Sequence, residues 1–385
     1  MPTPIGTLPT HATSETFVAG PDIGEDTKVE PSAAEMAEGF HRTGKPPARK
    51  LNWSMNKLGE WVQYLAMLEP QNFFPAQNTH TAGTMGGLSG VFFAKKSKRY
   101  VAHTAAGDEV YVSFTGHRWV LRDSGDGLSL GAAITCGVDT SQIGRFLLFC
   151  ASSASYYISS DSGESFTTGT VTGSGTRTVY AAVYDEFHAK TIAVGVNNST
   201  EDSAWYSADG LTLTRVPLTA GTLFPSLIAC DQATGRVVAA AVLGDRIWYS
   251  EDGGVTWGSY VHTFDNHTDL TFNQETSRWV LTTNDGEVLF ATDPRTAGGW
   301  TEVTEPEVPL LAIAAAGRNY VGITGVVGGL VPYFFFSQDE GETWQGHPRD
   351  DNTDRYVRHM DGRFVIFGSQ GIAMGVLRSS AELGS

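Results

Sequence analysis

The sequence predicts an all-β fold, a seven-bladed β-propeller preceded by a short α-helical N-terminal arm. Three observations lead to this prediction. A motif of the form Ser-x-Asp-x-Gly-x-Thr-Trp recurs along the chain, strand-like apolar segments recur between its copies, and the 44 glycines among 385 residues suit a chain of strands and turns. A repeat of about 40 to 50 residues with several strands per unit is typical of propeller blades.

Each copy of the motif predicts a turn that closes a β-hairpin. The Asp carboxylate can accept hydrogen bonds from the amides of the turn, the Gly can adopt positive φ, and the final aromatic residue begins the next strand and packs into the core. Residues 250–257 and 337–344 match position for position, and residues 159–166 differ by conservative replacements. We therefore assign structural roles to Ser159, Asp161, Gly163, Phe166, Ser250, Asp252, Gly254, Trp257, Ser337, Asp339, Gly341 and Trp344.

The spacing of the motif predicts the number of blades. With weaker copies included, the large residue that closes each unit falls at positions 119, 166, 213, 257, 300 and 344, which are 43 to 47 residues apart. A further unit begins near Tyr356 and stops before a fourth strand, so we expect the segment before Val91 to supply the missing strand and close the ring. Seven blades are predicted, with six or eight as alternatives.

The motif resembles the Asp-box, or BNR, repeat of sialidases and other propellers, over roughly residues 88 to 377. In those families the Asp-box is a structural turn between the third and fourth strands of a blade, at its periphery. The resemblance therefore implies a propeller with Asp-box turns, which we place at residues 88–385, and it does not imply catalysis.

The chain before the propeller has a different composition. Residues 1–70 are predicted as an extended arm with helices, and residues 71–87 as a Gly/Thr/Asn-rich connector. A helix predicted over residues 51–68 carries two apolar faces and therefore requires partners, or further copies of itself, on both sides. We predict a homo-oligomer, with a trimer as the expected state, held through Leu51, Trp53, Met55, Leu58, Trp61, Val62, Tyr64 and Leu65.

The same region contains Lys45-Pro46-Pro47-Ala48, Asn52-Trp53 and Gly59-Glu60-Trp61-Val62. These residues are similar to the N-terminal segment of many phage and prophage tail or fibre proteins. The resemblance implies attachment of residues 1–70 to other virion proteins, and a location in the virion after assembly in the host cytoplasm. The alternative interpretation is a plain helical cap on the propeller.

Composition narrows the choice of partners. The net charge is −16, from 26 basic and 42 acidic residues, and no cluster of lysines and arginines forms a stripe, which argues against nucleic acid. No apolar run is long enough to predict membrane insertion. Cys136, Cys150 and Cys230 are interpreted as buried free thiols. We expect no cofactor and no metal, because the spacing of His262 and His267 fits no established metal site.

Polar side chains gather in the loops between the predicted blades. Carboxylates can bind sugar hydroxyls and aromatic rings can stack on sugar faces, so these loops predict a site for a host-surface glycan. The alternative is that the loops are simply solvated. The candidate binding residues are Asp123, Asp126, Tyr260, His262, Asp265, Arg349, Asp350 and Asp351.

A glycan-cleaving activity has less support. A sialidase-like hydrolase requires two carboxyl-type groups and an arginine cluster, and the Phe/Tyr-Arg-Ile-Pro motif of sialidases is missing. No shared motif selects three among Arg118, Arg122, Arg145, Arg246, Arg278 and Arg318. We assign no catalytic residue and expect a virion structural protein: a tail fibre, tail-tip or head-decoration component. The alternatives are a glycan-cleaving tail enzyme and a non-viral propeller scaffold that assists assembly.

Overall fold

The computed structural model describes most of the chain from Leu88 onward, and every described residue belongs to one compact unit, Phe74–Glu382. The arm, helices and connector predicted within residues 1–87, including all eight predicted oligomerisation residues, lie outside the described part. The described residues are 88–104, 109–114, 116, 119–122, 126–128, 131–140, 144–218, 223–242, 244–303, 306, 308–324, 333–348, 354–368 and 371–375.

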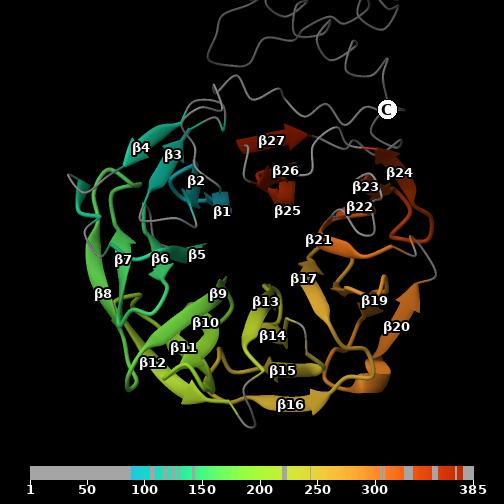
Figure 1. Cartoon of the computed structure of the whole chain (residues 1–385), viewed down its shortest axis with the longest axis horizontal. Helices are drawn as coiled ribbons and strands as arrows, with labels where there is room; N and C mark the ends of the chain where they lie inside the picture. The colour runs from blue at the N-terminus through green and yellow to red at the C-terminus, as the bar shows by residue number, and fades with distance from the viewer. Residues whose placement is uncertain are drawn as a thin grey trace, which may run out of the picture. The chain divides into compact units, whose positions relative to one another are not determined.

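The described residues form 27 strands in six sheets (Figure 1). The first sheet contains β1 (Leu88–Ala94), β2 (Arg99–Thr104), β3 (Val110–Ser113) and β4 (Val120–Arg122). The second contains β5 (Ile134–Asp139), β6 (Phe146–Cys150), β7 (Ser155–Ser159), β8 (Thr167–Val171), β9 (Arg177–Asp185), β10 (Lys190–Asn197), β11 (Glu201–Ser207) and β12 (Thr212–Pro217).

The remaining sheets repeat the same pattern of antiparallel neighbours. The third contains β13 (Pro225–Asp231), β14 (Arg236–Ala241), β15 (Arg246–Ser250) and β16 (Gly258–Val261). The fourth contains β17 (His267–Asn273), β18 (Arg278–Thr283), β19 (Val288–Ala291) and β20 (Trp300–Val303). The fifth contains β21 (Leu310–Ala316), β22 (Asn319–Thr324), β23 (Tyr333–Ser337) and β24 (Gln345–Pro348). The sixth contains β25 (Asp354–Met360), β26 (Arg363–Gly368) and β27 (Gly371–Gly375).

The first strand of each antiparallel run lies toward a common axis (Figure 1). These strands, which we call the inner strands, are β1, β5, β9, β13, β17, β21 and β25, and each contacts the next, with β25 contacting β1. The sheets of this unit therefore radiate from the axis as the blades of a propeller do. The prediction of an all-β propeller is confirmed. Among the described residues, helical structure is limited to short 3₁₀ turns such as Ala297–Gly299, and no helix there is long and apolar enough to cross a membrane.

The eight-stranded sheet consists of two four-stranded runs joined at their outer edges. β8 and β12 run parallel and pair through Thr170 with Thr212 and Val171 with Leu213. Thr172 strengthens the junction, because its amide donates to Leu213 O over 2.9 Å and its Oγ1 accepts from the Arg215 amide over 2.9 Å. This pairing covers two strand edges that would otherwise be open.

The core lies between neighbouring sheets. Strand β6 has the sequence Phe-Leu-Leu-Phe-Cys, and all five residues are buried because both faces of its sheet are covered. Phe92 of the first sheet meets Phe146 of the second edge to face, with ring centroids 5.5 Å apart. Cys150 and Cys230 are buried and Cys136 is half-buried, all as free thiols, which confirms the prediction for the first two.

The recurring motif forms the predicted turn. Around Asp252, the amides of Val255 and Thr256 donate to Oδ1 over 3.0 and 2.9 Å, and the Thr256 hydroxyl donates to Oδ2 over 2.6 Å. Equivalent bonds surround Asp161 and Asp339. The turns join β7 to β8, β15 to β16 and β23 to β24, the third and fourth strands of their runs.

The glycine of each turn meets two demands at once. φ is +89° at Gly163, +80° at Gly254 and +88° at Gly341, a region that other residues rarely adopt. A Cβ at Gly163 would also lie 2.8 Å from Val112 of the preceding sheet, and one at Gly341 would lie 2.5 Å from Phe290. The turns therefore pack directly against the neighbouring sheet.

Each inner strand also carries a β-bulge near its first residues. Three bulged residues have hydroxyl groups that reach the next inner strand. Ser89 Oγ donates to Ile134 O over 3.3 Å, Thr268 Oγ1 donates to Leu310 O over 2.6 Å, and Thr135 Oγ1 bonds the following strand β9 in the same way. These bonds link consecutive inner strands around the axis.

Candidate functional site: a cavity on the propeller axis

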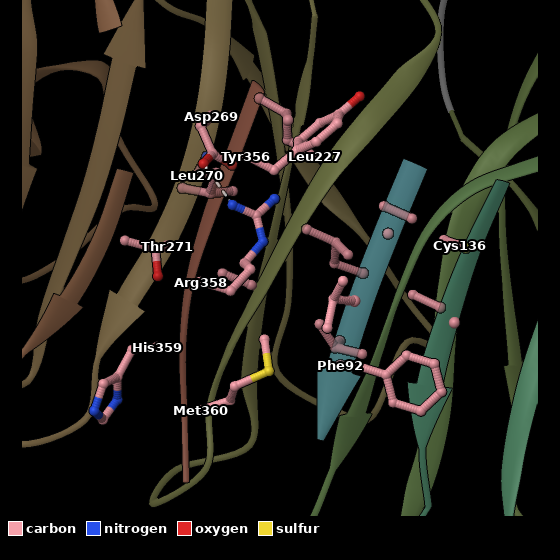
Figure 2. A pocket seen from close by; sticks show the side chains of 18 of the residues that line it. Phe92, Cys136, Leu227, Asp269, Leu270, Thr271, Tyr356, Arg358, His359 and Met360 are labelled. Atoms are coloured by element: carbon pink, nitrogen blue, oxygen red, sulfur yellow. Dashed lines mark hydrogen bonds and ion pairs between the residues drawn. The ribbon is translucent and has the colours of Figure 1, made fainter. Parts of the chain in front are cut away.

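A cavity of about 990 Å³ lies among the inner strands, and Figure 2 shows it from close by. A volume of this size is within the range of small-molecule sites. Most of its wall is apolar or small, because the inner strands present alanines, glycines and branched side chains there. Representative wall residues are Val91, Phe92, Ala181, Ala182, Ile228 and Leu270.

One ion pair stands inside this apolar wall. Asp269 of β17 and Arg358 of β25 meet with Oδ2 and Nη1 2.7 Å apart (Figure 2). Asp269 Oδ2 also accepts from the Ile313 amide of β21 over 2.9 Å, and Oδ1 accepts from the Leu270 amide over 3.0 Å. The carboxylate therefore accepts hydrogen bonds from three donors.

The two partners differ in exposure. The Asp269 side chain is 4% exposed, whereas that of Arg358 is 41% exposed. Arg358 Nη1 gives its second hydrogen bond to Val357 O over 2.8 Å. The carboxylate thus lies in the wall, and the guanidinium stands between the wall and the open space of the cavity.

Large adaptable side chains flank the ion pair. The Tyr356 ring stacks on Phe367, with centroids 5.1 Å apart and planes 20° apart. Met360 extends toward the open space in Figure 2, whereas the Phe92 ring packs between the first two sheets against Phe146. Aromatic rings and a thioether give this part of the cavity a soft apolar surface.

Polar groups collect in the turns at one end of the cavity. Lys95 and Lys98 come from the β1–β2 turn and Asp361 from the β25–β26 turn. Lys95 Nζ lies 2.9 Å from Glu186 Oε1, and Tyr100 OH donates to Asp361 over 3.1 Å. Burial, assisted by this bond, raises the pKa of Tyr100 to about 12.

A buried histidine lies beside the first inner strand. The His103 ring covers Gly90, where a Cβ would be 2.2 Å from Nε2, and its Nδ1 lies 2.9 Å from Ser89 Oγ. Burial lowers the pKa of His103 to about 4, so the ring is neutral at pH 7.

The predicted glycan residues do not line this cavity in the described part of the chain. Tyr260 OH donates to Pro294 O over 2.7 Å and accepts from Trp300 Nε1 over 2.7 Å. His262 is buried, and Asp265 is exposed on the surface. The Asp126 carbonyl accepts a hydrogen bond from the Phe166 amide. The other predicted residues lie outside the described part of the chain: Asp123, Arg349, Asp350 and Asp351.

His262 and His267 form a buried pair with ring centroids 5.7 Å apart. Their Nδ1 atoms lie 3.3 Å from Phe264 O and 3.1 Å from Ala241 O, respectively. Burial lowers both pKa values, that of His267 to about 4. Within the described ranges, no group of three or more His, Cys, Asp or Glu side chains is placed to hold a metal ion.

The arginines considered for catalysis lie elsewhere. None of Arg122, Arg145, Arg246, Arg278 and Arg318 lines the cavity, and Arg118 lies outside the described residues. Arg122 pairs with Glu164 over 2.6 Å, and Arg278 pairs with Glu340 over 3.7 Å. Arg358 is not among the site residues predicted from the sequence. Both Arg358 and Asp269 lie in strands that contain several other polar residues, so neither charge stands out in the sequence.

Comparison with known proteins places the chain among propellers. No family model and no curated protein matches the sequence. Among solved structures, YCF48 bound to D1 peptide superposes with a TM-score of 0.60 at 15% identity, covering 77% of this chain and 94% of that one. YCF48 from Cyanidioschyzon merolae gives 0.58 at 13%, covering 76% and 96%.

Enzymes share the same fold. The GH74 xyloglucanase from Xanthomonas campestris superposes with a TM-score of 0.59 at 14% identity, covering 77% of this chain and 53% of the enzyme. Virginiamycin B lyase from Staphylococcus aureus gives 0.60 at 10%, covering 76% and 95%. At such identities the likeness shows the fold alone, and this fold serves unrelated functions.

Proposed function

We propose that the chain is a structural protein of a tailed-phage virion, a tail-fibre, tail-tip or head-decoration component. Residues 1–70 attach it to other virion proteins and join copies of it, and the propeller is displayed. The observation that carries the proposal is the order of the two parts: the Lys-Pro-Pro, Asn-Trp and Gly-x-Trp pattern of residues 45–62 precedes a propeller. Because the propeller fold by itself selects no function, the N-terminal pattern supplies the assignment.

The propeller is proposed to bind rather than to cleave. Two acidic residues line the described part of the cavity wall, Asp269 and Asp361. Asp269 accepts hydrogen bonds from Leu270, Ile313 and Arg358, and Asp361 accepts one from Tyr100, so both carboxylates have structural partners. A glycoside hydrolase requires a pair of carboxyl groups free to act on one bond. One structural neighbour is described as bound to a peptide, which supports a binding role for such a ring.

A host-surface glycan is the ligand class proposed for the loop at residues 262–266. Asp265 is exposed there, and Asn266 Nδ2 lies 3.0 Å from its Oδ1 and 3.4 Å from Asp285 Oδ2. This cluster offers carboxylate and amide groups to sugar hydroxyls. The half-buried Tyr260 and the buried His262 lie next to this loop, and Tyr260 is bonded to Pro294 and Trp300.

We further propose seven blades with Asp-box turns. The eight-stranded sheet then counts as two blades, and the three-stranded sheet β25–β27 is completed by a strand from the segment before Val91. The hydrogen bonds of Asp161, Asp252 and Asp339 support the Asp-box resemblance.

Immunogold microscopy of intact virions, with antibody against the propeller, tests the assignment. We expect gold at one defined structure of the particle. The virion assignment would be contradicted if the particles stayed unlabelled and the protein appeared only in the supernatant of lysed host cells. Glycan binding is tested separately by measuring how tightly the Asp265→Ala variant binds to host cells, and weaker binding than that of the unaltered chain is expected. Release of sugar from host polysaccharide would instead favour the hydrolase alternative.

Deletion of residues 1–70 tests the arm. We expect the full chain to be an oligomer, with a trimer as the specific expectation, and the shortened chain to be a monomer in light-scattering measurements. An oligomer retained after the deletion would contradict a role of these residues in joining copies.

A further inference from the structure

We propose that the axial cavity is a binding site for a small anionic amphiphile, a carboxylate on an apolar body, and that Arg358 recognises the carboxylate. This site is separate from the glycan loop and does not depend on the virion assignment. It follows from the shape of the cavity, the remaining donors of Arg358 and the chemistry of the wall.

The guanidinium retains donors after its structural bonds are made. Arginine has five N–H groups, and the two on Nη1 go to Asp269 and Val357 O. The remaining three are on Nε and Nη2, and no described residue accepts a hydrogen bond from them. Together these two nitrogens form the planar edge that binds a carboxylate through two parallel hydrogen bonds.

The guanidinium is also held in place. Asp269 is anchored by two backbone amides and fixes Nη1 at 2.7 Å, so Arg358 loses less conformational entropy when a ligand binds than a mobile arginine would. Its 41% exposure leaves the other edge accessible from the cavity. Asp269 therefore acts as a positioning residue for the proposed contact.

The rest of the wall suits an apolar body. Val91, Ala181 and Ile228 line one part, and Met360 reaches toward the open space. Three hydroxyl groups of the wall, those of Ser89, Thr135 and Thr268, already bond backbone carbonyls of the next inner strand. An aliphatic or aromatic body removes the same wall from water favourably.

The overall charge of the chain does not favour an anionic ligand, so any preference for one must arise at Arg358 itself. The chain carries a net charge of −16, so its overall field repels anions. Asp269 offsets much of the charge of Arg358. A preference for an anionic ligand would therefore have to come from the geometry of the Arg358 guanidinium. If such a preference is measured, it points to this cavity as the binding site.

A matched pair of fluorescent probes tests the proposal. Pyrenebutyrate and pyrenebutanol share one apolar body and differ in a carboxylate against a hydroxyl. Titrated into the full chain, pyrenebutyrate should bind about tenfold more tightly or better, as expected for charge-assisted hydrogen bonds to a positioned guanidinium. Equal affinities, or tighter binding of the alcohol, would overturn the proposal.

Variants then locate the contact. Arg358→Gln should remove the preference for pyrenebutyrate while pyrenebutanol still binds. Arg278→Gln is the matched control: its guanidinium pairs with Glu340 and lies 5.2 Å from the Phe290 ring, away from the cavity, so the preference should remain. A preference that survives Arg358→Gln would place the probe elsewhere and overturn the proposal.

Two further variants keep the test decisive. Asp269→Asn with Arg358→Gln removes both charges together, so that neither partner is left unpaired if the single change prevents folding. The same loss of preference is expected. Leu227→Trp adds volume at a residue that lines the cavity and should weaken both probes several-fold, whereas unchanged affinity for both would show binding outside the cavity. Near-ultraviolet circular dichroism and melting curves confirm that each variant is folded.

Discussion

Arg358 donates a hydrogen bond to Asp269 over 2.7 Å even though their strands are not neighbours, because β21 lies between β25 and β17. The same carboxylate oxygen accepts from the Ile313 amide of the intervening strand. A single buried side chain therefore ties together three consecutive inner strands. Its loss should affect the ring as well as the cavity.

Asp269→Asn is expected to lower the free energy of unfolding by about 1 to 3 kcal/mol, because the amide group turns an N–H toward one of its former donors. The half-exposed Arg358 can regain water, which keeps the cost below that of breaking a fully buried pair. Urea unfolding measures the change. Asp265→Asn, at an exposed carboxylate, is the control and should cost no more than about 0.5 kcal/mol.

Asp252→Ala is expected to destabilise the fold by about 1 to 3 kcal/mol, since the Val255 and Thr256 amides and the Thr256 hydroxyl lose their acceptor. The turn lies at the outer strand β16, away from the cavity. Probe binding at saturating protein should therefore be unchanged. A stability equal to that of the unaltered chain would show that the turn tolerates loss of its carboxylate.

Three glycine-to-alanine changes separate strain from crowding. Gly163 has φ of +89° and a Cβ there would lie 2.8 Å from Val112, so both effects act, and a loss of roughly 2 to 4 kcal/mol is expected. Gly131 has φ of +61° with open space around it, so strain alone should cost roughly 1 kcal/mol. Gly298 has open space and no positive φ, and it should change little. An equal loss at Gly163 and Gly131 would rule out the crowding term.

Acid should destabilise the propeller through its buried histidines. The pKa of His267 is lowered from 6.5 to about 4, so the unfolded chain takes up a proton that the folded chain resists. The stabilisation is complete above pH 6.5 and declines toward pH 4, by about 2 kcal/mol between pH 7.5 and pH 5.0 for one such residue. His103 adds a second contribution of the same sign.

Urea unfolding at pH 7.5 and pH 5.0 checks this. His267→Gln should reduce the difference between the two pH values by about 2 kcal/mol, since it removes one titrating ring. Asp139 acts in the opposite sense, because burial raises its pKa to about 7, and the comparison of variant with unaltered chain cancels its effect. An identical pH difference in both proteins would contradict the assignment of His267.

The turns and the cavity differ in how far the sequence could predict them. Every hydrogen bond that the Asp252 carboxylate accepts joins residues within four positions, so the motif alone predicts it. Asp269 and Arg358 are 89 positions apart, and their contact depends on the ring bringing β17 and β25 to one axis. Loop composition predicts Tyr260 and His262 as ligand contacts, and their contacts with Trp300, 38 to 40 positions away, are not visible in that composition.

The parallel junction of β8 with β12 has a mechanical consequence. Because the two four-stranded runs share backbone hydrogen bonds, we expect them to move as one rigid unit. Any opening motion that admits a molecule to the axis should therefore occur between the other sheets. Slow hydrogen exchange at the Thr172 amide would show that the β8–β12 junction is rigid. We expect the entrance to the cavity to lie on the side of the propeller opposite this junction.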